Sequence, residues 1–209
     1  HIAYTAGSYE NFNFRRTTAE QFYTTAYLAY INGADGVELF NFAYYREWGP
    51  RNKGPFNEPP FEVIPKLGNK QWLAQNKNQN YFIAKVFDAP SVPGRQLPCY
   101  IEVKDSKTFT MQMVPPIGGW TTDGNLRVQI DEAYTDQVWS VFFNRVPLKE
   151  SDKTGEPYEN PYVGGIGSLD EYRAWTVPLN LMVEGQNRIE ITGREGKPSE
   201  IIYMELAVQ

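Results

Sequence analysis

Cysteine and histidine are almost absent from this chain, which has one of each among its 209 residues. The single Cys99 excludes an internal disulfide and any metal site built from several cysteines, and we expect it to be a buried, unreactive thiol. The only histidine is His1, so a histidine-centred catalytic triad and a histidine-rich zinc site are excluded within these residues. We therefore expect no cofactor and no bound metal.

Long apolar runs and basic patches are missing as well. No eighteen consecutive apolar residues occur, so the sequence predicts no membrane-spanning helix. Lysine and arginine are scattered and the net charge is −5, so no basic stripe exists that could follow a phosphate backbone. Neither nucleic acid nor a membrane span is expected.

Aromatic residues, in contrast, are abundant: the chain has 14 Tyr, 12 Phe and 5 Trp. Such an excess is common in the cores of β-sandwiches and in proteins that stack against sugar rings. The count alone leaves both interpretations open. The length allows one domain of generous size or two small ones.

The first eighty residues carry the helical signals. Thr17 and Glu20 have the spacing of a capping box, and apolar residues follow at helical spacing until Gly33, which stands where a helix-ending glycine would. The run 36–42 is apolar at nearly every position, which predicts a strand covered on both faces. A weaker helical region follows over 63–76.

From residue 81 the pattern changes to short alternating segments separated by turn residues. Their alternation is clearest at Leu126, Val128 and Ile130, between which Arg127 and Gln129 stand. The predicted strands cover 81–87, 97–103, 108–114, 126–130, 138–143, 174–177, 187–192 and 201–208. Short strands without intervening helices predict an antiparallel β-sandwich or jelly roll of about eight strands.

These two patterns divide the chain at about residue 80. We predict an α/β segment over 1–80 and a β-sandwich over 81–209. No low-complexity linker separates them, so we expect the two parts to pack against each other.

Both parts resemble bacterial glycoside-hydrolase-like proteins. Residues 33–42, Gly-Ala-Asp-Gly-Val-Glu-Leu-Phe-Asn-Phe, follow a capped helix and resemble the pattern G-A-D-G-I-x-x-F-N of the last barrel strand in those proteins. A second set of segments resembles the galactose-binding-domain-like β-sandwich that follows such barrels: 126–130, 138–144, 175–179 and 181–190. The resemblance implies a partial TIM-barrel-like β-α-β-α segment followed by a C-terminal sandwich.

The resemblance also implies a function. The chain would be the C-terminal portion of a glycoside hydrolase acting on polysaccharide, with an accessory sandwich that supports the barrel or binds carbohydrate. A closed barrel needs about 250 residues, so the remaining repeats, in the same gene product or in another chain, are an expected partner. The resemblance alone implies a secreted, periplasmic or cell-surface location. A stand-alone carbohydrate-binding module and a structural or protein-interaction domain without ligand remain alternatives.

Glycosidases use two carboxylates that flank the scissile bond, and in barrel enzymes these usually come from different strands. Residues 2–5 predict a short strand, interpreted as the seventh of the barrel, and Glu10 follows it on what would be the catalytic face. Glu10 is therefore the candidate catalytic carboxylate, with a solvated loop residue as the alternative. Because at least one partner carboxylate would lie elsewhere, we expect the chain alone to be inactive.

The candidate substrate-binding residues follow the predicted eighth strand. Asn41 could hydrogen-bond a sugar hydroxyl or cap the strand end. The next cluster supplies aromatic faces for stacking and charged groups for hydroxyls: Tyr44, Tyr45, Arg46, Glu47 and Trp48. The alternative is a loop whose aromatic residues cover the barrel.

Within the sandwich, a set of aromatic residues could form a second carbohydrate platform or could fill the core: Trp120, Trp139, Tyr158, Tyr162, Tyr172 and Trp175. Trp139 alternates within a strand and is expected in the core. Asp131, Glu132 and Asp136 are a weak calcium candidate without EF-hand spacing.

Overall fold

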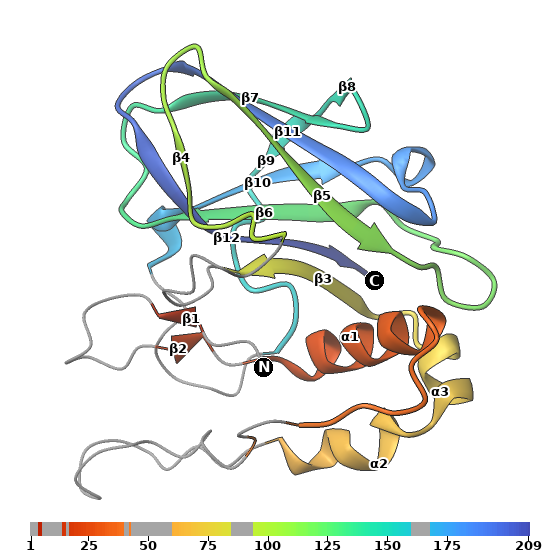
Figure 1. The fold of residues 1–209 in the computed structure, drawn as a ribbon. Coiled ribbons are helices and arrows are strands. Elements are labelled where there is room, and N and C mark those ends of the chain that lie inside the picture. The colour runs from red at the N-terminus through yellow and green to blue at the C-terminus, as the bar shows by residue number, and fades with distance from the viewer. Residues whose placement is uncertain are drawn as a thin grey trace, which may run out of the picture.

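Two antiparallel sheets form the larger part of the protein (Figure 1). The computed structural model describes residues 17–39, 42, 60–84, 94–159 and 168–209, together with the strands β1 (Tyr4–Thr5) and β2 (Phe14–Arg15). The predicted fold class is confirmed, since the described chain is mainly β with a small helical part near its N-terminus.

The first sheet has the strand order β3 (Gln79–Ala84), β12 (Ser199–Val208), β6 (Gly124–Ile130), β10 (Tyr172–Val177) and β9 (Lys149–Ser151), and β4 (Cys99–Ile101) also pairs with β12. The second sheet has the order β5 (Ser106–Met113), β11 (Gly185–Glu195), β7 (Val138–Phe143) and β8 (Val146–Pro147). Every predicted strand from residue 81 onward is present. The strand over 138–143 has the predicted bounds, and the others have shifted ends. The short strands β8 and β9 were not predicted, because two or three residues carry no measurable alternation.

The core lies between the two sheets. Leu126, Val128 and Ile130 of β6 are fully buried there, which confirms the predicted alternation. Trp139 of β7 stacks on Trp175 of β10 across the core, with ring centroids 6.5 Å apart. The prediction that Trp139 belongs to the core is confirmed.

Helix α1 (Ala19–Ile31) lies along β3, on the outer side of the first sheet (Figure 1). Its capping box is one residue later than predicted: Thr18 is the N-cap and Gln21, rather than Glu20, completes the box. The C-terminal prediction is confirmed. Gly33 has φ +92°, and the N–H groups of Gly33 and Ala34 donate to the carbonyls of Tyr30 and Ala29, which is the Schellman pattern.

The strand predicted over 36–42 is wrong for residues 36–39, which form no strand. Val37 and Leu39 are half-buried against the residues that pack around α1. An apolar run carries no period that distinguishes pairing in a sheet from packing on a helix, so this run could not settle the question. The short strand predicted over residues 2–5 is present as β1, but it pairs with β2 in an antiparallel sense.

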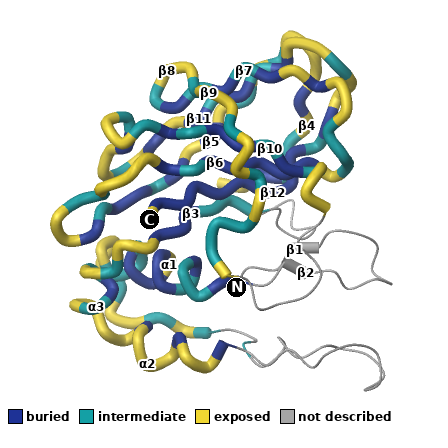
Figure 2. The backbone as a smooth tube through the Cα atoms, turned by 180° about the vertical axis from the view of Figure 1, so that it is seen from behind, coloured by how far each residue is buried: buried dark blue, intermediate teal, exposed yellow. Residues whose placement is uncertain are grey.

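The predicted helical region over 63–76 is present as three short pieces: the 3-10 turn η2 (Phe61–Val63) and the helices α2 (Ile64–Leu67) and α3 (Lys70–Gln75). Two further 3-10 turns, η3 (Leu169–Glu171) and η4 (Leu179–Leu181), flank β10. Figure 2 shows that β12 is buried along most of its length, whereas α2 and α3 expose an outer face. In β3, Gln79–Tyr81 are buried and Phe82–Ala84 are half-buried. The division at residue 80 remains a prediction.

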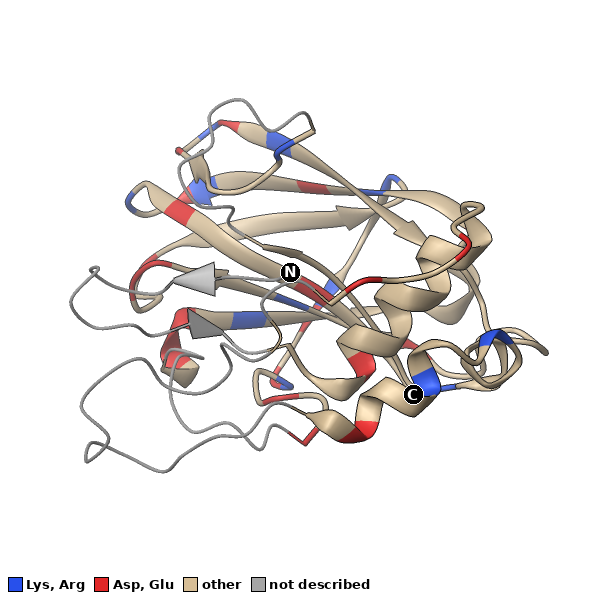
Figure 3. Cartoon of the chain, turned by 60° about the horizontal axis from the view of Figure 1, so that its bottom comes forward, with Lys and Arg blue, Asp and Glu red and all other residues tan. Residues whose placement is uncertain are grey.

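Charges are dispersed over the molecule. Figure 3 shows Lys and Arg interspersed with Asp and Glu along the described elements. Within the described ranges, no helix is both long and apolar enough to cross a membrane.

Candidate functional site

The site residues predicted from the sequence lie outside the described residues: Glu10, Asn41, Tyr44, Tyr45, Arg46, Glu47 and Trp48. Tyr162 of the second candidate platform lies outside them too. Their roles therefore stay predictions.

The other candidate platform residues are buried or half-buried. Trp139, Trp175 and Tyr172 are buried. Tyr158 is half-buried, and its hydroxyl donates to the carbonyl oxygens of Gln79, at 3.0 Å, and Val208, at 2.5 Å. These side chains hold the fold together, so the core interpretation applies to them rather than the platform.

Trp120 is half-buried, and its Nε1 donates to Gln79 Oε1 at 2.8 Å. The hydroxyl of Tyr81 donates to the same oxygen at 2.5 Å, and burial raises the pKa of that phenol. The Trp120 indole therefore anchors the loop before β6 to β3. Its hydrogen-bonding edge is not open to a ligand.

The calcium candidate is not supported. Among the residues that the structure describes, no three or more His, Cys, Asp or Glu side chains gather to hold a metal ion, so Asp131, Glu132 and Asp136 form no such site. Cys99 is half-buried rather than buried, and burial raises the pKa of its thiol. A raised pKa keeps the thiol protonated and poorly nucleophilic at neutral pH, as its predicted inertness requires.

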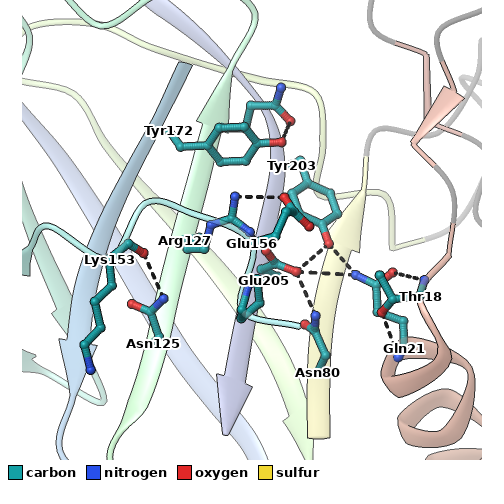
Figure 4. A network of polar contacts seen from close by, with 12 residues as sticks. Thr18, Gln21, Asn80, Asn125, Arg127, Lys153, Glu156, Tyr172, Tyr203 and Glu205 are labelled. Atoms are coloured by element: carbon teal, nitrogen blue, oxygen red, sulfur yellow. Dashed lines mark hydrogen bonds and ion pairs between the residues drawn. The ribbon is translucent and has the colours of Figure 1, made fainter. Parts of the chain in front are cut away.

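A buried polar network occupies the outer face of the first sheet (Figure 4). Because side chains alternate along a strand, Arg127 points away from the core that Leu126 and Val128 fill. Arg127 forms an ion pair with Glu205 of β12, and both side chains are 0% exposed. Arg127 also reaches Glu156, with an Nη2–Oε1 distance of 3.0 Å.

Glu205 accepts hydrogen bonds from several elements at once. Its Oε2 accepts from Tyr203 Oη at 2.9 Å and from Asn80 Nδ2 of β3 at 2.9 Å. Gln21 Nε2 of α1 approaches the same oxygen at 3.4 Å. A carboxylate buried away from water needs such compensation, and Arg127 together with these donors supplies it. Glu205 is thus committed to the fold and has no open side for a substrate.

Gln21 connects the start of α1 to the sheet. Its Oε1 accepts from the N–H of Thr18 at 3.1 Å, as part of the capping box, while its Nε2 donates to Tyr203 Oη at 2.5 Å. One turn later, Thr24 Oγ1 accepts from the N–H of Asn80 at 2.9 Å. The Gln21 side chain therefore both caps α1 and attaches it to β12, and Thr24 attaches the helix to β3.

This network was not predicted from the sequence. Its signal was a charged or amide side chain inside an otherwise apolar strand, which occurs at Arg127, Gln129 and Glu205. Such residues are seldom buried unless paired, so each one predicts a partner. The identity of the partner could not be inferred, since Gln21 lies 184 residues from Glu205.

No protein-family model matches the chain, and no curated protein matches it. Parts of it match solved structures. A β-porphyranase of glycoside hydrolase family 86 from the human gut bacterium Bacteroides plebeius matches at 18% identity and a TM-score of 0.36, over 63% of this chain and 20% of that one. The protein BuGH86 in complex with neoagarooctaose matches at 10% identity and a TM-score of 0.35, over 62% and 18% of the two chains.

A third match is the dimeric latent PorU from Porphyromonas gingivalis, at 14% identity and a TM-score of 0.33, over 64% of this chain and 13% of that one. The chain thus spans a fifth or less of the length of these structures. The likeness concerns part of a fold only.

Proposed function

We propose that this chain is the C-terminal portion of a glycoside-hydrolase-like protein that acts on polysaccharide, and that its β-sandwich supports the preceding α/β segment. The polysaccharide class rests on the sequence resemblance of residues 33–42 and of the sandwich strands. The catalytic carboxylates would come mostly from the remainder of the barrel, with Glu10 as the candidate within this chain. The same resemblance favours a secreted, periplasmic or cell-surface location.

The observation that carries the supporting role is the buried connection between α1 and the outer face of the first sheet. Tyr203 and Glu205 are 0% exposed and Asn80 is 1% exposed, and Gln21 of α1 donates to the first two of them. Without α1, the Glu205 carboxylate on this face of the sheet would lose the Gln21 amide from its set of hydrogen-bond donors. A sandwich that needs the helix to complete its own structure is suited to holding the helix in a fixed position.

Burial of the sandwich aromatics favours support over a stacking platform. Sugar rings stack on exposed aromatic faces, and the described candidates Trp139, Trp175 and Tyr172 have none to offer. The cluster 44–48, which lies outside the described residues, keeps its predicted role as the sugar-binding lining.

The experiment compares the complete gene product with the isolated chain in a reducing-sugar assay on a polysaccharide panel and on neoagarooctaose. We expect the complete product to release reducing ends and the isolated chain to release none. The upstream coding sequence should contain about six further strand-helix repeats, as a closed barrel requires. Turnover by the isolated chain that is lost in Glu10→Gln, or a gene without those repeats, would contradict the proposal.

A further inference from the structure

A groove of about 310 Å³ lies where α1 passes the edge strands of both sheets. Its sides are α1, the edge strand β3 of the first sheet and the edge strand β5 of the second. Its volume is at the lower end of the range of about 300–1,000 Å³ that small-molecule sites occupy. The groove can therefore hold one short piece of a ligand.

The lining of the groove is uncharged. Hydroxyl and amide side chains, among them Thr25, Gln96, Thr110 and Gln112, contribute its polar part, and apolar side chains such as Leu28 and Ile83 contribute the rest. A charged ligand would find no counter-charge there. A ligand hydroxyl both donates and accepts. The Gln96 and Gln112 amides each use one N–H within the protein and keep a second one that can donate, and the Thr25 hydroxyl can donate or accept. Thr25 and Thr110 are exposed, so a solute can reach the lining.

The backbone edges beside the groove are already partly occupied. The side chain of Gln96 imitates a neighbouring strand, because its Oε1 accepts from the N–H of Thr110 at 2.6 Å and its Nε2 donates to the Thr110 carbonyl at 2.9 Å. On β3, the backbone N–H of Asn80 donates a hydrogen bond to Thr24 Oγ1. Strand addition needs a run of open backbone groups, so these contacts argue against a peptide and favour a ligand recognised through side chains.

Hydrogen bonds between α1 and β5 fix the distance between two walls of the groove. Asn32, the C-cap of α1, and Gln112 of β5 exchange amide hydrogen bonds of 3.2 and 3.0 Å. With the Gln21 contacts near its N-terminus, α1 is tied at both ends. A pre-organised site loses less conformational freedom when it binds.

We propose that this groove binds a short, neutral stretch of a saccharide chain. The choice of a saccharide among neutral polyhydroxylated ligands rests on the proposed function. The groove places a sugar contact at the junction between helix and sandwich. There the sugar hydroxyls meet the Thr25 hydroxyl and the second N–H of the Gln96 and Gln112 amides, and the C–H faces meet the half-buried Leu28 and Ile83.

The test is a titration of the ¹⁵N-labelled full chain with neoagarooctaose, followed by amide chemical shifts. We expect saturable shifts confined to residues around 24–28, 80–83, 96 and 110–112. Thr25→Arg, which adds a long charged side chain at an exposed lining position, should abolish them. The control Thr121→Arg makes the same change at an exposed threonine that does not line the groove, and should leave them unchanged.

Each other outcome overturns the proposal. Shifts that are absent, that lie elsewhere, or that survive in Thr25→Arg contradict saccharide binding here. A response to an alternating Thr-Val peptide, without a response to the saccharide, assigns the groove to strand addition instead. If the complete gene product hydrolyses polysaccharide while the amide shifts of the groove residues do not change, this inference fails and the proposed function stands. If the groove residues show saturable shifts and the complete gene product hydrolyses no polysaccharide, the proposed function fails and binding in the groove stands.

Discussion

The two faces of the first sheet are buried in different ways. The inner face packs apolar side chains such as Leu126, Val128 and Met204 against the second sheet. The outer face buries Arg127 and Glu205 under α1 and neighbouring segments, and balances them with hydrogen bonds. Apolar packing tolerates many partners of suitable volume, whereas a buried ion pair requires particular ones. The outer face therefore depends on particular partners, Gln21 of α1 among them, whereas the inner face is held by apolar packing.

The outer face should give the largest loss when its charge balance is broken. Arg127→Met leaves Glu205 buried without its cation, and losing one partner of a buried pair costs about 3–5 kcal/mol. The control Arg188→Met breaks the exposed pair with Glu190, which should cost about 0–1 kcal/mol. Urea unfolding measures the loss of unfolding free energy in both variants. Equal losses would mean that the buried pair contributes no more to stability than the surface pair.

The inner face can be tested at the preceding residue, which points the opposite way. Leu126→Ala removes buried methyl groups and leaves a cavity, for an expected loss of about 2–5 kcal/mol. Leu126 is 0% exposed, so the substitution acts wholly within the core. A loss below about 1 kcal/mol, the scale of a surface substitution, would show that the inner face is loosely packed.

The contact between α1 and the outer face should give a smaller loss. Gln21→Ala removes a cap contact and a buried donor, for an expected loss of about 1–3 kcal/mol. Gln71→Ala, at an exposed position of α3, is the matched control and should be nearly neutral. In a double-mutant cycle with Glu205→Gln we expect a coupling of about 0.5–3 kcal/mol, whereas additive losses would separate the helix from the network.

The smallest expected effect is at Cys99, whose side chain packs against the edge of the inner core. Burial raises the pKa of its thiol, so less thiolate is present in the folded protein at a given pH. The pH midpoint of iodoacetamide alkylation should therefore lie above the ordinary value of about 8.5, and should fall when urea unfolds the chain. A midpoint at or below the ordinary value would show that the thiol is not shielded.

The inner face could be predicted from the sequence, because alternation in β6 and β11 is a local signal that burial imposes. The left-handed turn at Gly33 was also readable, since glycine tolerates a positive φ. The outer face could not be predicted, because the contact of Gln21 with Tyr203 depends on residues 182 positions apart. Residues 36–39 were misassigned as a strand covered on both faces. Only Val37 and Leu39 are half-buried there, whereas Gly36 and Glu38 are exposed, and the sequence did not indicate which partner the apolar residues pack against.

If the contacts of the outer face join α1 and the sandwich into one structural unit, the two should unfold together. Native-state hydrogen exchange tests this directly, because it measures the opening free energy of each segment separately. The buried α1 residues Ala26 and Tyr27 should exchange with nearly the same free energy as Val128 in β6. If the α1 amides exchange with an opening free energy several kcal/mol lower, the helix opens on its own, and the sandwich does not support it.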